Sequence, residues 1–388
     1  MNNSLLPHGL FVYLSDNQID KFKMKTTRVI DFFMPLDDHR RPSGNKQHEL
    51  LDIVAISICA VISGAESWNE IEQYAKIKQK WLSTFLALPN GIPSHDTFNR
   101  VISSICPKKF EECFGNWVAS LLVATGDVIS IDGKTICGAK VNGKSPIHMV
   151  SAWASTNNLV LGQVKVNEKS NEITAIPELI ENIAVEGAVI TIDAMGCQKK
   201  IAKCIIDKKA NYVFGLKENQ ADLLRQVVDE FRFSPIEQVN ESLDFGHGRI
   251  ETRVCSVIKN FDLVNSKKEW ASMSSIIRIE STREFKGKEK VEKSCRYYIS
   301  SLDVSAEKFQ EIIRSHWAIE NKLHWSLDVT FGEDFNRKRA SNAAQNFSLI
   351  SKIALNLAKK ETSQKLGIKS KLKIAGWDEN YLLKILGF

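Results

Sequence analysis

The stretch VISIDG, residues 128–133, is the part of this chain that says most about its fold. Four residues suited to a buried strand lead directly into Asp132, and a glycine follows. A second stretch, AVITID at residues 188–193, has the same design and ends in Asp193. Aspartate is a poor strand residue, and ligands of α/β sheets collect at the carboxyl ends of strands. Either aspartate alone could equally well cap the next turn, but the pair favours a functional site.

The segments around these two stretches alternate between strand and helix patterns. Residues 147–153 and 159–166 predict strands, and Thr156-Asn157-Asn158 between them predicts a hairpin turn. Three strands that can pair antiparallel, followed by right-handed crossovers, have the topology of an RNase H-like α/β domain. The later elements of this predicted domain are helices at about 173–183, 199–208 and 220–231 and strands at 188–193 and 211–216.

Two regions outside this core have different periodicities. Residues 48–119 repeat apolar side chains at three- and four-residue spacing, which predicts an all-helical N-terminal domain. Residues 243–303 contain alternating segments with Thr, Val, Ile and Tyr, which we interpret as a β-rich insertion before helices at about 306–327 and 340–360. The predicted organisation is an N-terminal extension (1–27), a helical domain (28–122), an RNase H-like domain (126–360) with its insertion, and a basic C-terminal tail (361–388).

The composition predicts a soluble globular protein of the cytoplasm. Of the 388 residues, 43% are hydrophobic and 25% are charged, which suggests neither disorder nor a fibrous repeat. The longest apolar run, residues 53–62, is much shorter than the roughly 20 residues of a membrane span, and the N-terminus lacks the features of a secretory signal. Eight cysteines without a C-x-x-C pair or zinc-finger spacing predict reduced thiols.

Positive charge is concentrated at the C-terminal end of the chain. The whole chain carries +6, but from Arg337 onward 11 Lys and Arg residues face 3 Asp and Glu residues, a local charge of +8 that leaves −2 on the rest. Such a segment could hold a polyanion, although a run of charges is usually only a solvated face. Its candidate phosphate contacts are Arg337, Lys338, Arg339, Lys365, Lys369, Lys371 and Lys373.

A third carboxylate is predicted on the helix that follows the insertion. A helical wheel places Glu320 on one face with Ile313, His316 and Leu327, in the middle of an apolar stripe. A charge at such a position must be paired, neutralised or bound to a metal. Two nearby aspartates favour metal binding over an ion pair with Lys or Arg. The rivals for this third role are Asp328, Glu333 and Asp334, which are expected to be solvated or paired with Arg337 and Arg339.

Three convergent carboxylates are hard oxygen ligands of the kind that bind Mg²⁺, with Mn²⁺ as a substitute. Two such ions about 4 Å apart can activate a water or a 3′-hydroxyl and stabilise the leaving oxygen of a displacement at phosphorus. The predicted chemistry is therefore cleavage or transfer of a phosphodiester.

Six motifs occur in order: SHDTF with RV at 94–101, IDGKT at 131–135, KSNEI at 169–173, DAMGCQ at 193–198, GHGRIE at 246–251, and HWAIEN with LHW at 316–325. They closely resemble the H-repeat-associated proteins of bacterial Rhs elements and the ISAs-type insertion-sequence transposases, over nearly everything after residue 28. The resemblance implies a DDE transposase whose catalytic and metal-binding acids are Asp132, Asp193 and Glu320. It also implies Mg²⁺ as cofactor, and a homodimer on double-stranded DNA at the nucleoid.

The last helix departs from related DDE enzymes. Their Tyr-x-x-Arg-x-x-x-Glu-x₆-Lys pattern has Ile313, His316 and Leu327 at its Tyr, Arg and Lys positions here. The contact with a DNA phosphate would then be made by His316, Lys322 or Arg314. Further DNA contacts are predicted at Lys134, His247 and Arg249, the last two in a motif that reads as a β-turn.

Two rival functions stay open at this point. The first is a decayed or domesticated relative that binds DNA without cutting it, and its binding would not depend on a divalent metal. The second is a metal-dependent nuclease without strand transfer, which would yield no products joined to a target duplex.

Overall fold

The structure is a computed structural model, and the predicted N-terminal extension lies outside the residues that it describes. The same is true of His247 and of Lys169 and Ser170 in the KSNEI motif. The described residues are 28–40, 46–122, 126–139, 146–167, 171–246, 248–287 and 291–388.

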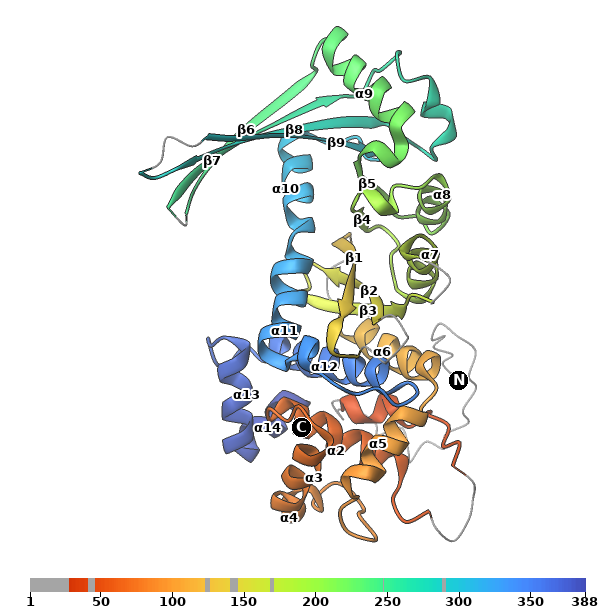
Figure 1. Cartoon of the computed structure of the whole chain (residues 1–388), viewed down its shortest axis with the longest axis vertical. Helices are drawn as coiled ribbons and strands as arrows, with labels where there is room; N and C mark the ends of the chain where they lie inside the picture. The colour runs from red at the N-terminus through yellow and green to blue at the C-terminus, as the bar shows by residue number, and fades with distance from the viewer. Residues whose placement is uncertain are drawn as a thin grey trace, which may run out of the picture.

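A mixed sheet of nine strands, in the order β3-β2-β1-β4-β5-β9-β8-β7-β6, forms the centre of the molecule (Figure 1). Strands β1 (Val128–Ile136), β2 (Ile147–Ala154) and β3 (Leu159–Lys165) pair antiparallel, which confirms the predicted hairpin. Strands β4 (Val189–Ile192) and β5 (Asn211–Leu216) continue the sheet parallel to β1. Crossover helices α7 (Glu172–Asn182) and α8 (Lys199–Asp207) pack on one face of these strands.

The predicted β-rich insertion is part of the same sheet. Its strands are β6 (Gln238–Gly246), β7 (Arg249–Ile258), β8 (Ser275–Phe285) and β9 (Val291–Ser300), and β9 pairs antiparallel with β5. We call these four strands the wing, because they project sideways from the core strands in Figure 1. Helix α9 (Ala221–Phe233) packs against β9, and α10 (Ala306–His316) packs against β6 and β7.

Helices make up the lower part of the molecule in Figure 1. The described residues of 28–122 form a 3₁₀ turn (Val29–Phe33) and five helices. Helix α12 (Ala343–Lys360) packs against both this group and β3, so its side chains are buried along almost its whole length. The N-terminal helices are α2 (Leu50–Ile62), α3 (Trp68–Ile77), α4 (Gln79–Leu82), α5 (His95–Ser104) and α6 (Pro107–Leu121).

The C-terminal segment is not the tail that the sequence predicts. It forms α13 (Ile368–Trp377) and α14 (Glu379–Leu386), which pack on each other and on α12. Leu382 and Leu386 are buried in the main hydrophobic core. Alternating lysines had suggested a solvated segment, but apolar residues at helical spacing between them supply a buried face. None of the helices described is long and apolar enough to cross a membrane.

The long helix predicted at 306–327 is interrupted. Helix α10 (Ala306–His316) is followed by a π-helical turn (Ile319–His324) and then by α11 (Trp325–Phe331). In the π turn the N–H of Trp325 donates to the carbonyl of Glu320, so one extra residue enters the turn and rotates the following faces. Glu320 is exposed, while Ile319 and Leu323 are buried. The prediction that Glu320 lies within a buried apolar stripe is wrong.

Candidate active site

Parallel pairing of β1 and β4 brings Asp132 and Asp193 side by side. The two strands stay in register up to the pair Ile131 and Ile192, and each aspartate is the next residue. Equivalent residues of neighbouring parallel strands point to the same face of a sheet, so both carboxylates face one side. Strand β1 runs on to Ile136 in its pairing with β2, so Asp132 marks the end of the β4 pairing and not the end of its strand.

Asp193 also acts as a helix cap. Its Oδ1 accepts hydrogen bonds from the backbone N–H groups of Met195 (3.1 Å) and Gly196 (3.4 Å), at the start of a 3₁₀ turn. The capping role that we weighed against a functional one is therefore present at this residue. Capping uses only one carboxylate oxygen, so it orients the side chain and leaves the second oxygen available to a ligand.

Asp132 lies in a strongly unfavourable environment for a negative charge. Burial, reinforced by the carboxylates of Glu172, Asp193 and Glu320, raises the pKa of Asp132 to about 7, although the N–H of Gly133 donates to it. The nearest cationic candidate is His324, whose Nδ1 lies 3.7 Å from Asp132 Oδ2. Burial lowers the pKa of His324 to about 4, so this imidazole is neutral at physiological pH and cannot compensate the charge.

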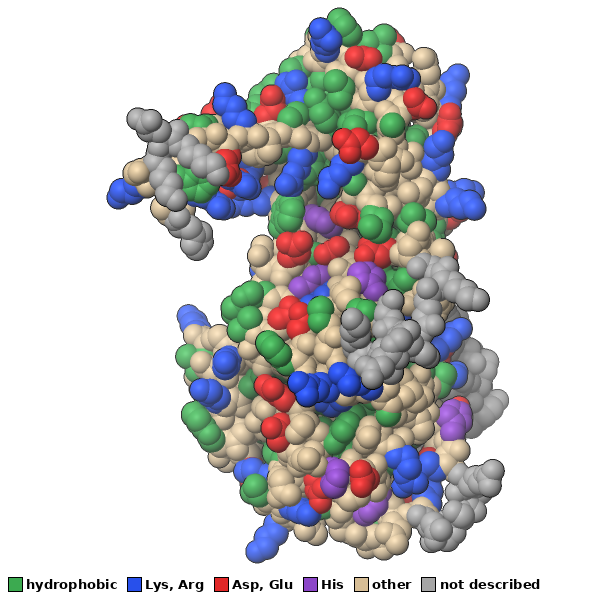
Figure 2. All heavy atoms as spheres, viewed as in Figure 1, with side chains coloured by type: hydrophobic (Ala, Val, Ile, Leu, Met, Phe, Trp, Pro, Cys, Tyr) green, Lys and Arg blue, Asp and Glu red, His purple; other side chains and the backbone are tan. Residues whose placement is uncertain are grey.

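Glu320 is one of three acids, with Glu172 and Asp193, whose negative charges act on Asp132. Within the described part of the chain, no Lys or Arg forms an ion pair with Asp132, Asp193 or Glu320. Nor do any three His, Cys, Asp or Glu side chains there converge closely enough to enclose a metal ion. The chemistry of the donors still fits Mg²⁺, because they are carboxylates, and no Lys or Arg among the described residues balances their charges. Figure 2 shows acidic and histidine side chains gathered across the waist of the molecule, below the wing.

Glu172 is a fourth acid at this place, and we assigned it no role from the sequence. It is the first residue of α7, where the side chain of Asn171 caps the helix by accepting from the N–H of Ile173. Nε2 of His148 lies 2.6 Å from Glu172 Oε1, and Nδ1 of the same ring lies 2.8 Å from Thr135 Oγ1. Asn171 and Glu172 of the KSNEI motif are the sequence signal for this acid, because a capping asparagine followed by a glutamate indicates a carboxylate at the start of a helix.

Gly133 permits this approach. A Cβ atom at position 133 would lie 2.1 Å from Glu172 Oε1 and 2.4 Å from His148 Nε2, well inside van der Waals contact. The glycine next to Asp132 therefore lets Glu172 and His148 come close to the strand.

Lys134 pairs with all three acids that are alternatives to Glu320 for the third catalytic role. Its Nζ lies 2.7 Å from Asp328, 2.8 Å from Asp334 and 3.3 Å from Glu333. The expected pairing of these acids with Arg337 and Arg339 is wrong, and Glu333 is buried instead of solvated, with 4% of its side chain exposed. Lys134 faces carboxylates instead of solvent, which leaves no free ammonium for the DNA contact predicted there.

The remaining predicted DNA contacts differ in their exposure. Lys338 is buried: its Nζ donates to the carbonyl of Glu66 (2.6 Å) and lies 3.5 Å from the ring centre of Phe347. Nδ1 of His316 lies 3.0 Å from Oγ1 of Thr191 on β4. Burial lowers the pKa of the His316 imidazole, which disfavours its charged form. Lys371 is also buried, with carbonyl partners. Those at least partly exposed are Arg249, Arg314, Lys322, Arg337, Arg339, Lys365, Lys369 and Lys373.

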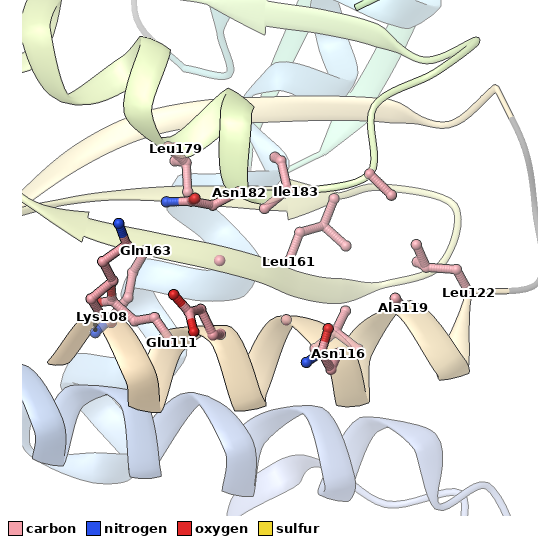
Figure 3. A pocket seen from close by; sticks show the side chains of 15 residues that line it. Lys108, Glu111, Asn116, Ala119, Leu122, Leu161, Gln163, Leu179, Asn182 and Ile183 are labelled. Atoms are coloured by element: carbon pink, nitrogen blue, oxygen red, sulfur yellow. Dashed lines mark hydrogen bonds between the residues drawn. The ribbon is translucent and has the colours of Figure 1, made fainter. Parts of the chain in front are cut away.

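A groove of about 290 Å³ between α6, β3 and α7 lies apart from these carboxylates (Figure 3). Glu111 points into it toward Gln163, whose Nε2 lies 3.4 Å from Glu111 Oε1. Burial raises the pKa of Glu111 to about 7. Asp132, Asp193 and Glu320 are not among its lining residues, so this groove is not the candidate active site.

Comparisons with known proteins agree with this arrangement. Residues 124–357 match the family described as the transposase DDE domain, and residues 30–118 match the family described as DDE_Tnp_1-associated. The H repeat-associated putative transposase YhhI of Escherichia coli K12 is 40% identical over 378 residues, which cover 94% of this chain and 98% of that protein. The putative transposase YncI of Escherichia coli O157:H7 is 40% identical over 373 residues, covering 94% and 95%.

Proposed function

Because this chain belongs to the family of transposases with a DDE domain, we propose that it cuts and joins DNA at the ends of an insertion-sequence element. The observation that carries the proposal is the in-register pair Asp132 and Asp193, with Glu320 close by and no Lys or Arg of the described chain paired to any of the three. Uncompensated carboxylates are costly to fold unless a cation or substrate uses them.

We assign Asp132, Asp193 and Glu320 as the residues that would hold Mg²⁺ or Mn²⁺. When bound, such ions supply charge stabilisation for in-line attack at phosphorus. A bound cation would relieve the repulsion that the other acids exert on Asp132, and this carboxylate must lose its proton before it can act as a ligand. The backbone N–H groups hold one oxygen of Asp193, and Glu320 is exposed in the π turn, where DNA can reach it.

The strand order β3-β2-β1-β4-β5, with three antiparallel strands followed by parallel ones, supports an RNase H-like core for this chemistry. We further propose that the helices of residues 28–122 form an associated domain and that two copies act together. Joining an element to a target requires both of its ends at one place, which a homodimer would provide.

Purified protein incubated with the DNA that flanks its own gene tests this proposal. With Mg²⁺ or Mn²⁺ we expect cleavage at the element ends and products joined to a target duplex, and with a chelator we expect binding alone. Binding without cleavage in every metal would favour the DNA-binding rival, and cleavage without joined products would favour the nuclease.

A further inference from the structure

Four arginines of the wing lie on the side that faces α10, and a fifth, Arg314, lies on α10 itself. One row of residues paired across β6, β7, β8 and β9 consists of Asp244, Glu251, Arg283 and Glu292. The row two residues away along each strand, on the same face, consists of Ser242, Arg253, Ser281 and Ser294. Ser242 bonds Gln310 and Asp244 bonds Arg314, both on α10, so these rows lie on the α10 side. Alternation along the strands places Arg249, Arg253, Arg283 and Arg296 on this face, and Arg314 of α10 adjoins them through Asp244. We call these five residues the arginine face.

A buried carboxylate orients three of these guanidinium groups. Glu251, with 4% of its side chain exposed, lies 2.8 Å from Arg253, 3.0 Å from Arg283 and 3.4 Å from Arg249. A guanidinium has five N–H donors in a fixed plane, so a pair with one carboxylate leaves donors free. Asp244 similarly pairs with both Arg253 and Arg314.

These arginines keep access to solvent. The exposed fractions of the side chains are 56% for Arg314, 39% for Arg283, 38% for Arg249 and 20% for Arg253. The five arginines face three carboxylates, Asp244, Glu251 and Glu292, so the face has a net positive charge. In Figure 2, Lys and Arg side chains gather along the lower edge of the wing. The opposite face of the wing differs, since it exposes Val239, Leu243, Phe245, Ile250 and Val291.

The arginine face reaches the helix that carries Glu320. The guanidinium carbon of Arg296 lies 5.1 Å from the ring centre of Trp317, three residues before Glu320. Arg314 lies six residues before Glu320, about 9 Å along a helix axis. Positive groups therefore extend from the carboxylate site outward along the wing.

We propose that this face binds the phosphate backbone of the duplex on which the carboxylate site acts. The inference rests on the proposed function for the identity of the partner. Planar guanidinium groups held at fixed positions suit bidentate contacts to phosphate, and such contacts position DNA without reading its sequence. The buried Glu251 is then a positioning residue that keeps the guanidinium planes in place before DNA arrives.

Binding of a labelled element-end duplex, measured without divalent metal over a range of salt concentrations, tests the inference. For Arg249→Ala combined with Arg283→Ala, we expect the slope of log affinity against log salt to become shallower by about 0.9 for each lost phosphate contact. Arg296→Ala should have a similar single effect. The matched control is Lys293→Ala, because Lys293 is exposed on the same strand as Arg296 but on the opposite face, and it should leave affinity and slope unchanged.

The outcomes separate this inference from the proposed function. Failure of the wild-type protein to bind any duplex would overturn the proposed function. Normal wild-type binding with unchanged slopes in the arginine variants, or an equal loss in Lys293→Ala, would overturn only the assignment of this face. Should the double variant unfold, Arg296→Ala decides the matter, since Arg296 is exposed and its guanidinium group packs over the ring of Trp317.

Discussion

Asp132 carries an energetic cost that a cation would relieve. Because its pKa is raised from 3.8 to about 7, the folded protein binds this proton more tightly than the unfolded chain does. The free energy of unfolding therefore decreases as pH rises from about 4 to about 7. Above about pH 7, the raised pKa of Asp132 lowers the free energy of unfolding by on the order of 4 kcal/mol at most.

Asp132→Asn removes this penalty, so the metal-free variant should melt at a higher temperature than the wild type at pH 8 and at the same temperature below pH 4. Mg²⁺ should raise the melting temperature of the wild type, more at pH 8 than at pH 6, and should not raise that of the variant. Melting curves with and without Mg²⁺ provide the measurement. Equal Mg²⁺ effects in the two proteins would place the ion elsewhere.

The two aspartates were predictable because both end apolar runs of similar length, and parallel pairing then brings them together. The capping residue before Glu172 indicates a helix start, but the place of Glu172 beside Asp132 depends on the absence of a side chain at Gly133 and on contacts with His148. Lys338 was predicted as a phosphate contact because a charge pattern treats every cation as exposed, whereas here aromatic rings and a carbonyl bury it.

At the scale of elements, the contact between β1 and α7 depends on Gly133. Gly133→Ala would force Glu172 and His148 apart, and we expect the free energy of unfolding to fall by about 1–3 kcal/mol, as for other overpacked sites. Chemical denaturation provides the measurement. Gly367→Ala is the control, because its Cβ would meet nothing within 4 Å. Equal stabilities of the two variants would show that Glu172 and His148 move aside freely.

Lys134 joins β1 to the segment after α11. Burial alone would lower the pKa of Lys134, but the three neighbouring carboxylates raise this pKa above its usual range. Lys134→Met should lower the free energy of unfolding by about 3 kcal/mol, because it leaves the buried Glu333 short of a partner. Lys203→Met, which breaks an exposed pair with Asp207, should cost about 0–1 kcal/mol. If Lys134→Met left stability unchanged but weakened DNA binding, the result would instead support the DNA contact predicted for Lys134.

The π turn shows where sequence periodicity stops being informative. A wheel of 3.6 residues per turn predicts Glu320 among apolar residues, but the buried face contains the neighbouring Ile319 and Leu323, and a π turn interrupts the helix here. The strands and helices of the core were predicted to within a few residues, since each combines a clear period with turn or capping residues at its ends.

At the scale of the whole molecule, helices from the early part of the described chain and its C-terminal helices pack together. Deleting residues 362–388 would remove α13 and α14 and expose the core that Leu372, Leu382, Ile385 and Leu386 complete. The expected loss is on the order of 6 kcal/mol or more, comparable with the entire stability of a domain. We expect a protein that aggregates or lacks a cooperative melting transition. The control replaces Lys365, Lys369 and Lys373 by Ala, since these are exposed, and a stable deletion variant would refute the packing role.

Pairing between segments far apart in the sequence explains why domain boundaries were harder to predict than elements. The wing joins the core through the pairing of β9 with β5, and α12 packs on helices that precede it by more than 200 residues. Local patterns identify each of these elements but do not say which distant element covers its apolar face.

The central claim is that Asp132, Asp193 and Glu320 together carry metal-dependent DNA cleavage. The most direct measurement compares Mg²⁺-dependent cleavage of the element-end duplex by the wild type, Glu320→Gln and Glu311→Gln. Glu311 is the matched control, because it is an exposed glutamate on the preceding helix with 59% of its side chain accessible. We predict that Glu320→Gln binds the duplex as the wild type does but nearly loses cleavage, while Glu311→Gln cleaves normally. Cleavage by Glu320→Gln at the wild-type rate would contradict the assignment.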